Sequence, residues 1–495
     1  MENKQYIISV DQSTSATKGI LFDLKGEKIA ETSLPHKQYY PKPGWVEHDP
    51  EEIFRNTISV ISNLLKMRRI PEENILGLTI TNQRETVVVW DKRSGKPFYN
   101  AVVWQCLRGT EICEKYRIEG YENVILEKTG LILDPYFSAS KIRWVMDYVK
   151  PPPDSTLVGT IDSWLIWKLT NGKVHATDYS NASRTMLLNI RNLSWDEELL
   201  DLFGIPRSAM PELLPSNSIF GFSNCEGTLR REVPVSGVIG DSQAALFGEG
   251  CFEKGMTKVT YGTGSSIVMN IGYEYIAPPK GIVTSIGWGI NKDIPYIFEG
   301  NVHATGATIR WLMENMGIMA KAEMNDIEKI CFSLEDNEGV YFVPAFSGLG
   351  APYWENRAKG IIYGLTFKTK REHIIRAAVE AIAYQIRDVL EVLTRNSGIE
   401  IREVKADGGA AKNNFLMQFQ ADILGIPVQR AFIDDMSAFG SFLMGGLGFG
   451  VWDNLKELKN LLMEKRWDVF SPKIAPEKRE KYYSEWRKII KKSLP

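Results

Sequence analysis

The sequence predicts an α/β protein made of two related halves that face each other across a cleft. Short β-branched or aromatic runs alternate with amphipathic runs of helical period, which is typical of α/β folds. One pattern also recurs at long range, because an apolar strand ends in an aspartate followed by small hydroxyl or glycine residues. This pattern occurs near residue 11 and again near residues 241 and 407. The rough duplication indicates two halves of similar design.

Length and composition indicate a multi-domain enzyme. The chain has 495 residues, which suits about two to four domains. Its 59 Lys and Arg against 61 Asp and Glu create no long-range field, so nucleic-acid binding is not expected. No apolar run reaches about 18 residues and the N-terminus lacks the features of a signal peptide, so we expect a cytoplasmic protein without membrane insertion. The five cysteines show no CxxC spacing, so neither a disulfide framework nor a zinc site is expected.

The predicted elements follow from residue type and periodicity. Six β-branched or aromatic runs are predicted as strands: Tyr6–Val10, Gly19–Phe22, Leu76–Thr81, Thr86–Trp90, Thr257–Tyr261 and Ser266–Ile271. Apolar residues at helical spacing predict helices. These are Ile53–Leu65, Ile374–Leu393, Asn414–Leu424 and a charged amphipathic outer helix, Pro476–Lys492. Two proline-rich segments, Lys150–Asp154 and Pro278–Gly281, are expected to be surface loops.

The first motif that carries chemistry is the hairpin after the first strand. The strand delivers Asp11 into a turn of hydroxyl residues, Gln12-Ser-Thr-Ser-Ala-Thr, that ends at Lys18. Turn amides and hydroxyls can surround phosphate oxygens, while a carboxylate at a strand end can hold hydrated Mg²⁺. Lys18 can add positive charge on a transferring phosphate. The GxxxxGK[ST] loop is absent, and a plain Ser/Thr hairpin turn is the alternative interpretation.

The second motif combines Asp241 with a glycine-rich turn. Asp241 follows a short apolar strand and Gly240, where a substrate hydroxyl can approach and give up its proton during phosphoryl transfer. The alternative is a helix cap for a helix that starts near Gln243. The turn Gly262–Gly264 lets backbone amides reach further phosphate oxygens.

The third motif, Asp407-Gly408-Gly409, leads through Asn413 into an amphipathic helix. Its glycines let the backbone approach a planar or phosphate group, and a helix N-terminus favours anions. Two adjacent glycines alone are weak evidence for such a site.

Together, the three segments resemble the ATP site of the actin–hexokinase–Hsp70 superfamily and, within it, the FGGY family of carbohydrate kinases. Tyr136–Val145 fits the first signature of that family, and Gly360–Glu380 fits the second. Long stretches such as Pro43–Pro50 and Phe342–Tyr353 are similar to the glycerol kinases of the family. The resemblance implies two actin-like ATPase (ribonuclease H-like) domains, of which residues 1–247 bind the polyol and residues 248–495 bind ATP.

The resemblance also implies a reaction and a set of site residues. ATP would phosphorylate a terminal hydroxyl of a small polyol, glycerol above all, to give sn-glycerol 3-phosphate, with Asp241 as the general base. Arg84, Glu85, Tyr136 and Asp241 would hold the polyol hydroxyls, which suits the donors of a guanidinium and the acceptors of a carboxylate. Trp104 would form an apolar wall beside the substrate carbons, although a core tryptophan fits the sequence equally well. The resemblance further implies a homodimer or homotetramer. The residues near the nucleotide would be Asp11 at Mg²⁺, Thr14, Ser15, Lys18, Thr263 and Gly306 at the phosphates, and Gly408, Gly409 and Asn413 at the nucleoside.

Two departures from the glycerol-kinase pattern concern substrate choice. Ser242 replaces a glutamine beside Asp241, and Ser266 replaces the phenylalanine that usually follows the glycine-rich turn. These small hydroxyl residues predict a larger, more polar pocket, and contacts of this size are worth about 1–3 kcal/mol in discrimination. The alternative substrate is therefore a larger polyol or ketose, such as erythritol, xylulose or an inositol. Local repacking around both serines would instead preserve glycerol as the substrate.

Other departures concern the phosphates, regulation and catalysis itself. The pattern DQGTTSSR reads DQSTSATK over Asp11–Lys18, which keeps hydroxyls and a positive charge but not the guanidinium fork. Glu226–Arg231 differs from the Gly-Gly-Thr-Arg pattern of the fructose-1,6-bisphosphate loop, so that feedback site is expected to be missing or altered. A non-catalytic clamp protein that binds sugar and ATP is the alternative from another class. The retained Asp11 and Asp241 argue against it.

Overall fold

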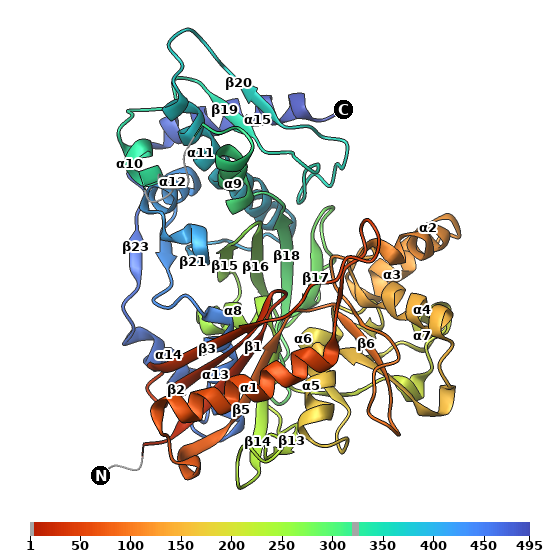
Figure 1. Ribbon diagram of the computed structural model, residues 1–495. Coiled ribbons are helices and arrows are strands. Elements are labelled where there is room, and N and C mark those ends of the chain that lie inside the picture. Colours follow the sequence, from red (N-terminus) through yellow and green to blue (C-terminus); the bar gives the residue numbers. More distant parts are fainter. Residues whose placement is uncertain (1–3, 319–325) are drawn as a thin grey trace.

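Two large β-sheets frame the molecule in the computed structural model, which describes residues 4–318 and 326–495 (Figure 1). The first sheet contains β1 (Tyr6–Gln12), β2 (Ala16–Asp23), β3 (Lys28–Pro35), β5 (Ile75–Asn82), β13 (Gly221–Ser223) and β14 (Val233–Gly240). The second contains β15 (Thr257–Tyr261), β16 (Ser265–Gly272), β17 (Val283–Ile286), β18 (Tyr296–Val302), β21 (Val404–Asp407), β22 (Val428–Arg430) and β23 (Asp468–Phe470).

The two sheets share one topology. The first has the order β13-β14-β5-β1-β2-β3, and the second has the order β17-β18-β16-β15-β21-β22-β23. In each, an antiparallel hairpin (β1–β2 or β15–β16) is extended by two parallel strands (β5 and β14, or β21 and β22). The α/β class and the duplication expected from the sequence are therefore confirmed.

The first half carries an additional lobe, seen at the right of Figure 1. A smaller sheet has the order β4-β7-β6-β8 and lies among short helices. The elements of this lobe are β4 (Glu47–His48), β6 (Val87–Asp91), β7 (Ala101–Val102), β8 (Thr156–Thr160), α2 (Thr110–Ile118), α3 (Glu122–Thr129), α4 (Ser138–Val149) and α7 (Glu197–Phe203). Most of it is inserted between β5 and β14, so residues near the end of β5 face both the lobe and the main sheet.

Two helices join the halves. α8 (Asp241–Gly248) follows β14 and packs against α13 (Met436–Gly448), which also packs against β1, β5 and β14 of the first sheet. The close packing of α13 against α8 requires glycine at position 440, because a Cβ on Gly440 would lie 1.8 Å from the carbonyl oxygen of Ala244. The predicted boundary between residues 247 and 248 falls at the end of α8 and stays a prediction.

The remaining helices mostly cover the second sheet. α9 (Gly306–Glu314), α10 (Ile327–Phe332), α11 (Arg371–Ser397), α12 (Asn414–Leu424) and α15 (Pro476–Ser493) gather above it, whereas α1 (Pro50–Arg68) packs against β2 and β3 (Figure 1). The outer helix α15 buries one apolar face, since Trp486 stacks on Tyr384 at 5.2 Å and donates to Asp388 at 2.9 Å. The other elements are β9 (Ala176–Asp178), β10 (Leu188–Asn189), β11 (Ser194–Trp195), β12 (Glu212–Leu214), β19 (Tyr341–Val343), β20 (Ile361–Tyr363), α5 (Ile161–Leu169), α6 (Tyr179–Ala182) and α14 (Leu455–Met463).

The predicted strands and helices are all present, most of them with ends that differ by a few residues. The predictions for Thr257–Tyr261 and Asn414–Leu424 match their elements end to end. The five cysteines are buried and unpaired. Among the described residues, no helix has the length and apolar character needed to span a bilayer.

Candidate active site

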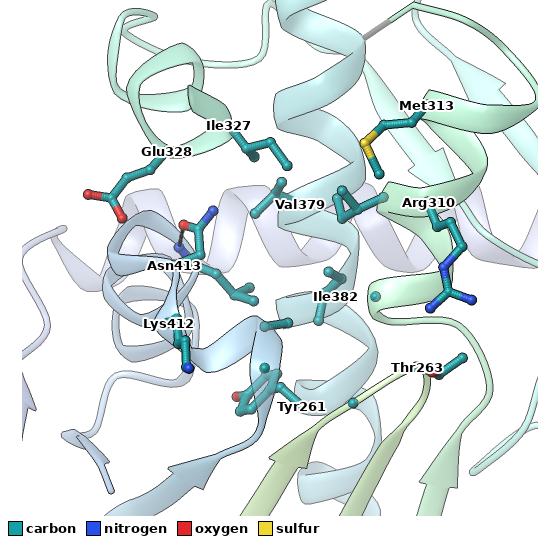
Figure 2. Close-up of a pocket in the computed structure, with 16 residues that line it drawn as sticks. Tyr261, Thr263, Arg310, Met313, Ile327, Glu328, Val379, Ile382, Lys412 and Asn413 are labelled. Atoms are coloured by element: carbon teal, nitrogen blue, oxygen red, sulfur yellow. Dashed lines mark hydrogen bonds between the residues drawn. The ribbon is translucent and has the colours of Figure 1, made fainter. Parts of the chain in front are cut away.

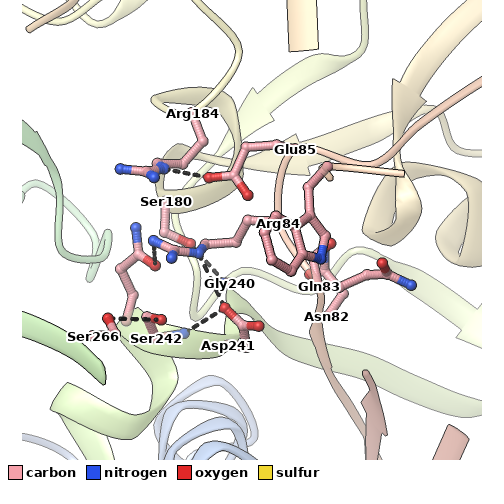
Figure 3. A network of polar contacts seen from close by, with 12 residues as sticks. Asn82, Gln83, Arg84, Glu85, Ser180, Arg184, Gly240, Asp241, Ser242 and Ser266 are labelled. Carbon is pink, nitrogen blue, oxygen red and sulfur yellow. Dashed lines mark hydrogen bonds and ion pairs between the residues drawn. The ribbon is translucent and has the colours of Figure 1, made fainter. Parts of the chain in front are cut away.

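The centre of the site is the buried turn that follows β5. Arg84 lies in this turn, and its two terminal nitrogens donate to the carboxylate of Glu299 on β18 at 2.7 and 2.9 Å. Its Nε lies 3.0 Å from Oδ1 of Asp241, and Nη1 donates to Oε1 of Gln243 at 3.1 Å. One guanidinium therefore ties the end of β5 to Asp241 at the start of α8, as Figure 3 shows, and to the second sheet through Glu299.

Glu85 and Arg184 complete a buried network of charges. Nε of Arg184 donates to Oε1 of Glu85 at 2.5 Å, and its Nη1 lies 3.1 Å from Oε2 of Glu299. Burial alone would raise the pKa of Glu299, but Arg184 and Arg84 outweigh burial and hold that pKa well below its usual range. For Glu85, burial dominates and raises the pKa despite the same two arginines.

Sequence reasoning missed both Glu299 and Arg184. Glu299 is a fully buried charge in the apolar strand β18, and that contrast is the signal by which the sequence could have revealed it. Nothing in the local sequence around Arg184 indicates a partner 99 residues away.

Asp241 stands at the solvent-accessible side of this network. Gly240 is the N-cap of α8, and Asp241 is the first helical residue, so the alternative of Asp241 as the cap of a helix starting near Gln243 is wrong. Oδ1 of Asp241 accepts from the amide of Ser242 at 2.7 Å, and the side chain is 38% exposed. A carboxylate held in this way on one oxygen can present the other to a bound hydroxyl.

Trp104 and Tyr136 lie together on the lobe side. Their rings meet edge to face at 5.4 Å, and Nε1 of Trp104 donates to Oγ1 of Thr14 at 2.9 Å. The half-buried Trp104 therefore connects the hairpin turn of the first sheet to Tyr136. This hydrogen bond across elements distinguishes it from a tryptophan packed only in the core.

The two serines that depart from the glycerol-kinase pattern touch each other. Oγ of Ser266, on β16, donates to Oγ of Ser242, on α8, at 3.5 Å (Figure 3). They come from opposite halves of the molecule, so their contact lies at the junction of the two.

Asp11 and Lys18 face each other across the hairpin β1–β2. Burial, with the negative charge of Asp241 nearby, raises the pKa of Asp11 to about 7. Lys18 forms an ion pair with Asp435, the N-cap residue of α13, and its Nζ lies 3.7 Å from Glu31. The hairpin is thus held against α13, one of the two helices that join the halves.

A cavity of about 660 Å³ opens in the second half, between the turn β15–β16 and helices α9, α11 and α12 (Figure 2). Its walls are largely apolar, with a few polar side chains at opposite ends. Figure 2 shows Arg310 and Thr263 on one side and Asn413, Lys412 and Glu328 on the other. The lining residues are Tyr261, Gly262, Thr263, Gly306, Ile309, Arg310, Met313, Ile327, Glu328, Val379, Ile382, Gly409, Ala410, Lys412, Asn413 and Leu416. An apolar slot with a few convergent polar groups is typical of a small-molecule site.

Similarity to known proteins identifies the family of this chain. The N-terminal domain of the FGGY family of carbohydrate kinases matches residues 6–248, and the C-terminal domain of that family matches residues 257–449. The chain belongs to this family. The kinase is 51% identical over 494 residues to glycerol kinase 1 of Thermotoga maritima, with 99% of each chain covered. It is 46% identical over 495 residues to glycerol kinase 2 of the same organism, again with 99% of each covered.

The fold of the chain is also similar to solved structures of carbohydrate kinases. The kinase matches Plasmodium falciparum glycerol kinase with ADP at a TM-score of 0.93 and 36% identity, covering 99% of both chains. A xylulose kinase from Lactobacillus acidophilus matches at a TM-score of 0.88 and 22% identity, which shows a shared fold.

The predicted site residues of this kinase form four groups. Arg84, Glu85, Asp241, Ser242 and Ser266 gather around the charge network. Trp104 and Tyr136 lie beside Thr14 of the hairpin. Of the residues predicted for the nucleotide, Thr263, Gly306, Gly409 and Asn413 line the cavity, and Gly408 lies next to it. Asp11, Thr14, Ser15 and Lys18 belong to the hairpin of the first sheet and do not line the cavity.

Arg310 is a cavity residue that the sequence analysis did not select. It lies just over one turn into α9, whose first residue is Gly306, and it is exposed. The cavity-lining role becomes visible only when α9 is placed against the turn β15–β16. Backbone bonds from Thr305 and Gly306 to the carbonyls of Thr263 and Gly262, at 2.9 and 3.0 Å, make that placement.

Proposed function

We propose that this kinase transfers the γ-phosphoryl group of ATP to a terminal hydroxyl of glycerol, giving sn-glycerol 3-phosphate. The similarity to glycerol kinases over almost the whole chain carries the proposal, since relatives 46–51% identical are glycerol kinases. The clustering of Arg84, Glu85 and Asp241 supports it, because a polyol needs both donors and acceptors at fixed positions.

The polyol would lie against the charge network. Arg84 donates to hydroxyl oxygens, Glu85 and Asp241 accept from hydroxyl hydrogens, and Trp104 and Tyr136 cover the carbon chain. Asp241 accepts the proton of the attacking hydroxyl as its oxygen approaches the γ-phosphorus in line. The contact between Nε of Arg84 and Oδ1 of Asp241, at 3.0 Å, orients the base before substrate binds.

The nucleotide would occupy the cavity of the second half. Gly408, Gly409 and Asn413 contact the nucleoside, and the phosphates lie beside Thr263 and Gly306, which line the same cavity. The hairpin adds Thr14, Ser15 and Lys18 from the first half, so that positive charge and amides meet the equatorial oxygens of the transferred group. Closure of the two halves on ATP would exclude water, which otherwise competes as acceptor.

Asp11 fits the position of a Mg²⁺ ligand. It is a buried carboxylate whose pKa is raised to about 7 by burial and by Asp241, so a cation would relieve an unfavourable environment. Mg²⁺ keeps several waters and is typically held by one or two carboxylates plus substrate phosphates. Among the described residues there is no cluster of three or more His, Cys, Asp or Glu side chains that could hold a metal. The ion, when bound, neutralises phosphate charge.

A second candidate is the same reaction on a larger polyol or ketose, such as erythritol, xylulose or an inositol. The contact between Ser242 and Ser266, at 3.5 Å, favours it, since two small hydroxyl side chains meet beside Asp241. They offer hydrogen bonds rather than an apolar wall to the substrate.

Initial rates of ADP release with Mg-ATP test both candidates. Glycerol, erythritol, xylulose, ribulose and myo-inositol are compared at equal concentration. The highest kcat/KM on glycerol supports the proposal, whereas a tenfold preference for another acceptor supports the second candidate. ATP consumption that does not depend on any added polyol would contradict both and favour an ATP-driven clamp protein. A cytoplasmic location and a homodimeric or homotetrameric assembly remain predictions.

A further inference from the structure

Lys141 is a completely buried lysine in the first turn of α4, with no exposed surface. Its Nζ donates to the carbonyl oxygens of Pro135, Tyr136 and Phe137 at 2.9, 2.5 and 2.8 Å. An ammonium group carries three N–H bonds, so three successive carbonyls use all of its donors. The contacts close a tight loop just before α4.

Burying the ammonium group of Lys141 has a high free-energy cost, which a side chain that only filled space would not require. Taking an ammonium out of water costs several kcal/mol, and that cost is usually offset by a carboxylate partner. No carboxylate lies within ion-pair distance of Lys141 among the described residues. The hydrogen bonds of Lys141 among the described residues all go to these carbonyls, which indicates that the lysine fixes the shape of the loop.

The loop carries two groups of the polyol site. Tyr136 projects its ring against Trp104, and the next-but-one residue, Ser138, donates from Oγ to the carbonyl oxygen of Glu85 at 3.2 Å. Glu85 has φ of 60°, a left-handed conformation that a residue with a side chain adopts only at some cost. The loop therefore holds Tyr136 directly and the strained backbone of Glu85 through Ser138.

We propose that Lys141 is a positioning residue for the polyol site, which fixes the Pro135–Phe137 carbonyls so that Tyr136 and Glu85 keep the orientation that binds substrate. The inference rests on the proposed function, because it takes Tyr136 and Glu85 as polyol-binding groups. Lys141 itself touches no substrate.

The charge state of Lys141 gives an independent signature. Burial lowers its pKa to about 8, while Glu85, Cys106, Asp134 and Cys113 act in the opposite direction. Below this pH the ammonium serves all three carbonyls, and above it a neutral amine has two N–H bonds, so one carbonyl loses its donor. The polyol KM should therefore rise as the pH passes 8.

The test compares Lys141→Met with wild type on the best acceptor of the polyol panel. We expect the polyol KM to rise about tenfold or more, since small misplacements of binding groups cost up to about 100-fold, while the ATP KM stays within about twofold. The increase in polyol KM above pH 8 should be absent from the variant. Combined with Tyr136→Phe, the loss should be smaller than the product of the two single losses, because Lys141 acts partly through Tyr136. Lys115→Met, on the exposed face of α2, is the matched control and should match wild type.

An unchanged polyol KM in folded Lys141→Met would overturn the inference, and so would equal increases in the polyol and ATP KM values. If Lys141→Met does not fold, the wild-type profile decides, since a polyol KM that stays flat between pH 7 and 9 also contradicts it. Failure of the proposed function looks different: wild type would then accept no polyol, before any variant is compared.

Discussion

Arg84 and Glu299 form a buried two-point ion pair that joins the two halves of this FGGY kinase. Arg84 follows β5 of the first sheet, Glu299 lies on β18 of the second, and their side chains meet at 2.7 and 2.9 Å with at most 5% of either exposed. The same guanidinium holds Asp241 at 3.0 Å. One side chain thus contributes both to the relative placement of the halves and to the orientation of the proposed base.

Glu299→Gln should destabilise the fold and weaken polyol binding. Removing one partner of a buried pair costs on the order of 3–5 kcal/mol, because Arg84 and Arg184 would share an uncompensated positive charge. We expect a lower Tm and a higher polyol KM. Thermal unfolding and initial rates measure both, with the exposed Glu274→Gln as a control. A wild-type Tm with an unchanged polyol KM would show that the pair contributes to neither.

Asp241→Asn should lower kcat by about 10²–10⁴-fold, the range typical for loss of a general base. The amide oxygen of asparagine can still accept from Nε of Arg84, so the polyol KM should change little. Steady-state kinetics at saturating ATP measure both parameters, and Asp201→Asn, an exposed carboxylate on α7, serves as the control. Turnover close to wild type would remove Asp241 from the mechanism.

Arg310→Ala should raise the ATP KM by about tenfold, because a charged hydrogen bond to a phosphate is worth roughly 1.5–3 kcal/mol. The polyol KM should stay unchanged, since Arg310 lines only the cavity of the second half. Nucleotide titration and initial rates test this, with Arg402→Ala, 85% exposed, for comparison. An unaltered ATP KM would place the phosphates away from Arg310.

Gly408→Ala should lower the Tm of the nucleotide-free protein, whereas Gly409→Ala should not. Gly408 has φ of 90°, and a Cβ there would lie 2.7 Å from the carbonyl oxygen of Tyr261, while a Cβ on Gly409 meets nothing within 4 Å. With ψ of 169°, this backbone conformation is essentially confined to glycine and costs a residue with a side chain on the order of 1–3 kcal/mol. Equal Tm values for the two variants would show that the turn accommodates the added methyl group.

The fold class was predictable because its signals are local. Tyr6–Val10 and Thr257–Tyr261 read as strands from their own residue types, and each precedes a polar turn that reappears in the other half. Asp11, Asp241 and Asp407 stand at strand ends, which the chain order alone reveals. The burial of one face of α15 was harder to predict. Its charged residues indicate an outer helix, whereas Trp486 is buried against α11 and donates to Asp388, about 100 residues away in the sequence.

The sequence by itself determined the α/β class, the duplicated halves, the family resemblance and the residue types available for phosphoryl transfer. These properties depend on periodicity and on short contiguous motifs, which can be recognised in the sequence without knowing any tertiary contact. Only the tertiary structure decided that Glu299 and Arg184 complete the network around Arg84, that Arg310 lines the cavity of the second half, and that Ser242 touches Ser266. Such contacts join residues from separate elements, and the packing of the two sheets around α8 and α13 brings them within hydrogen-bond distance.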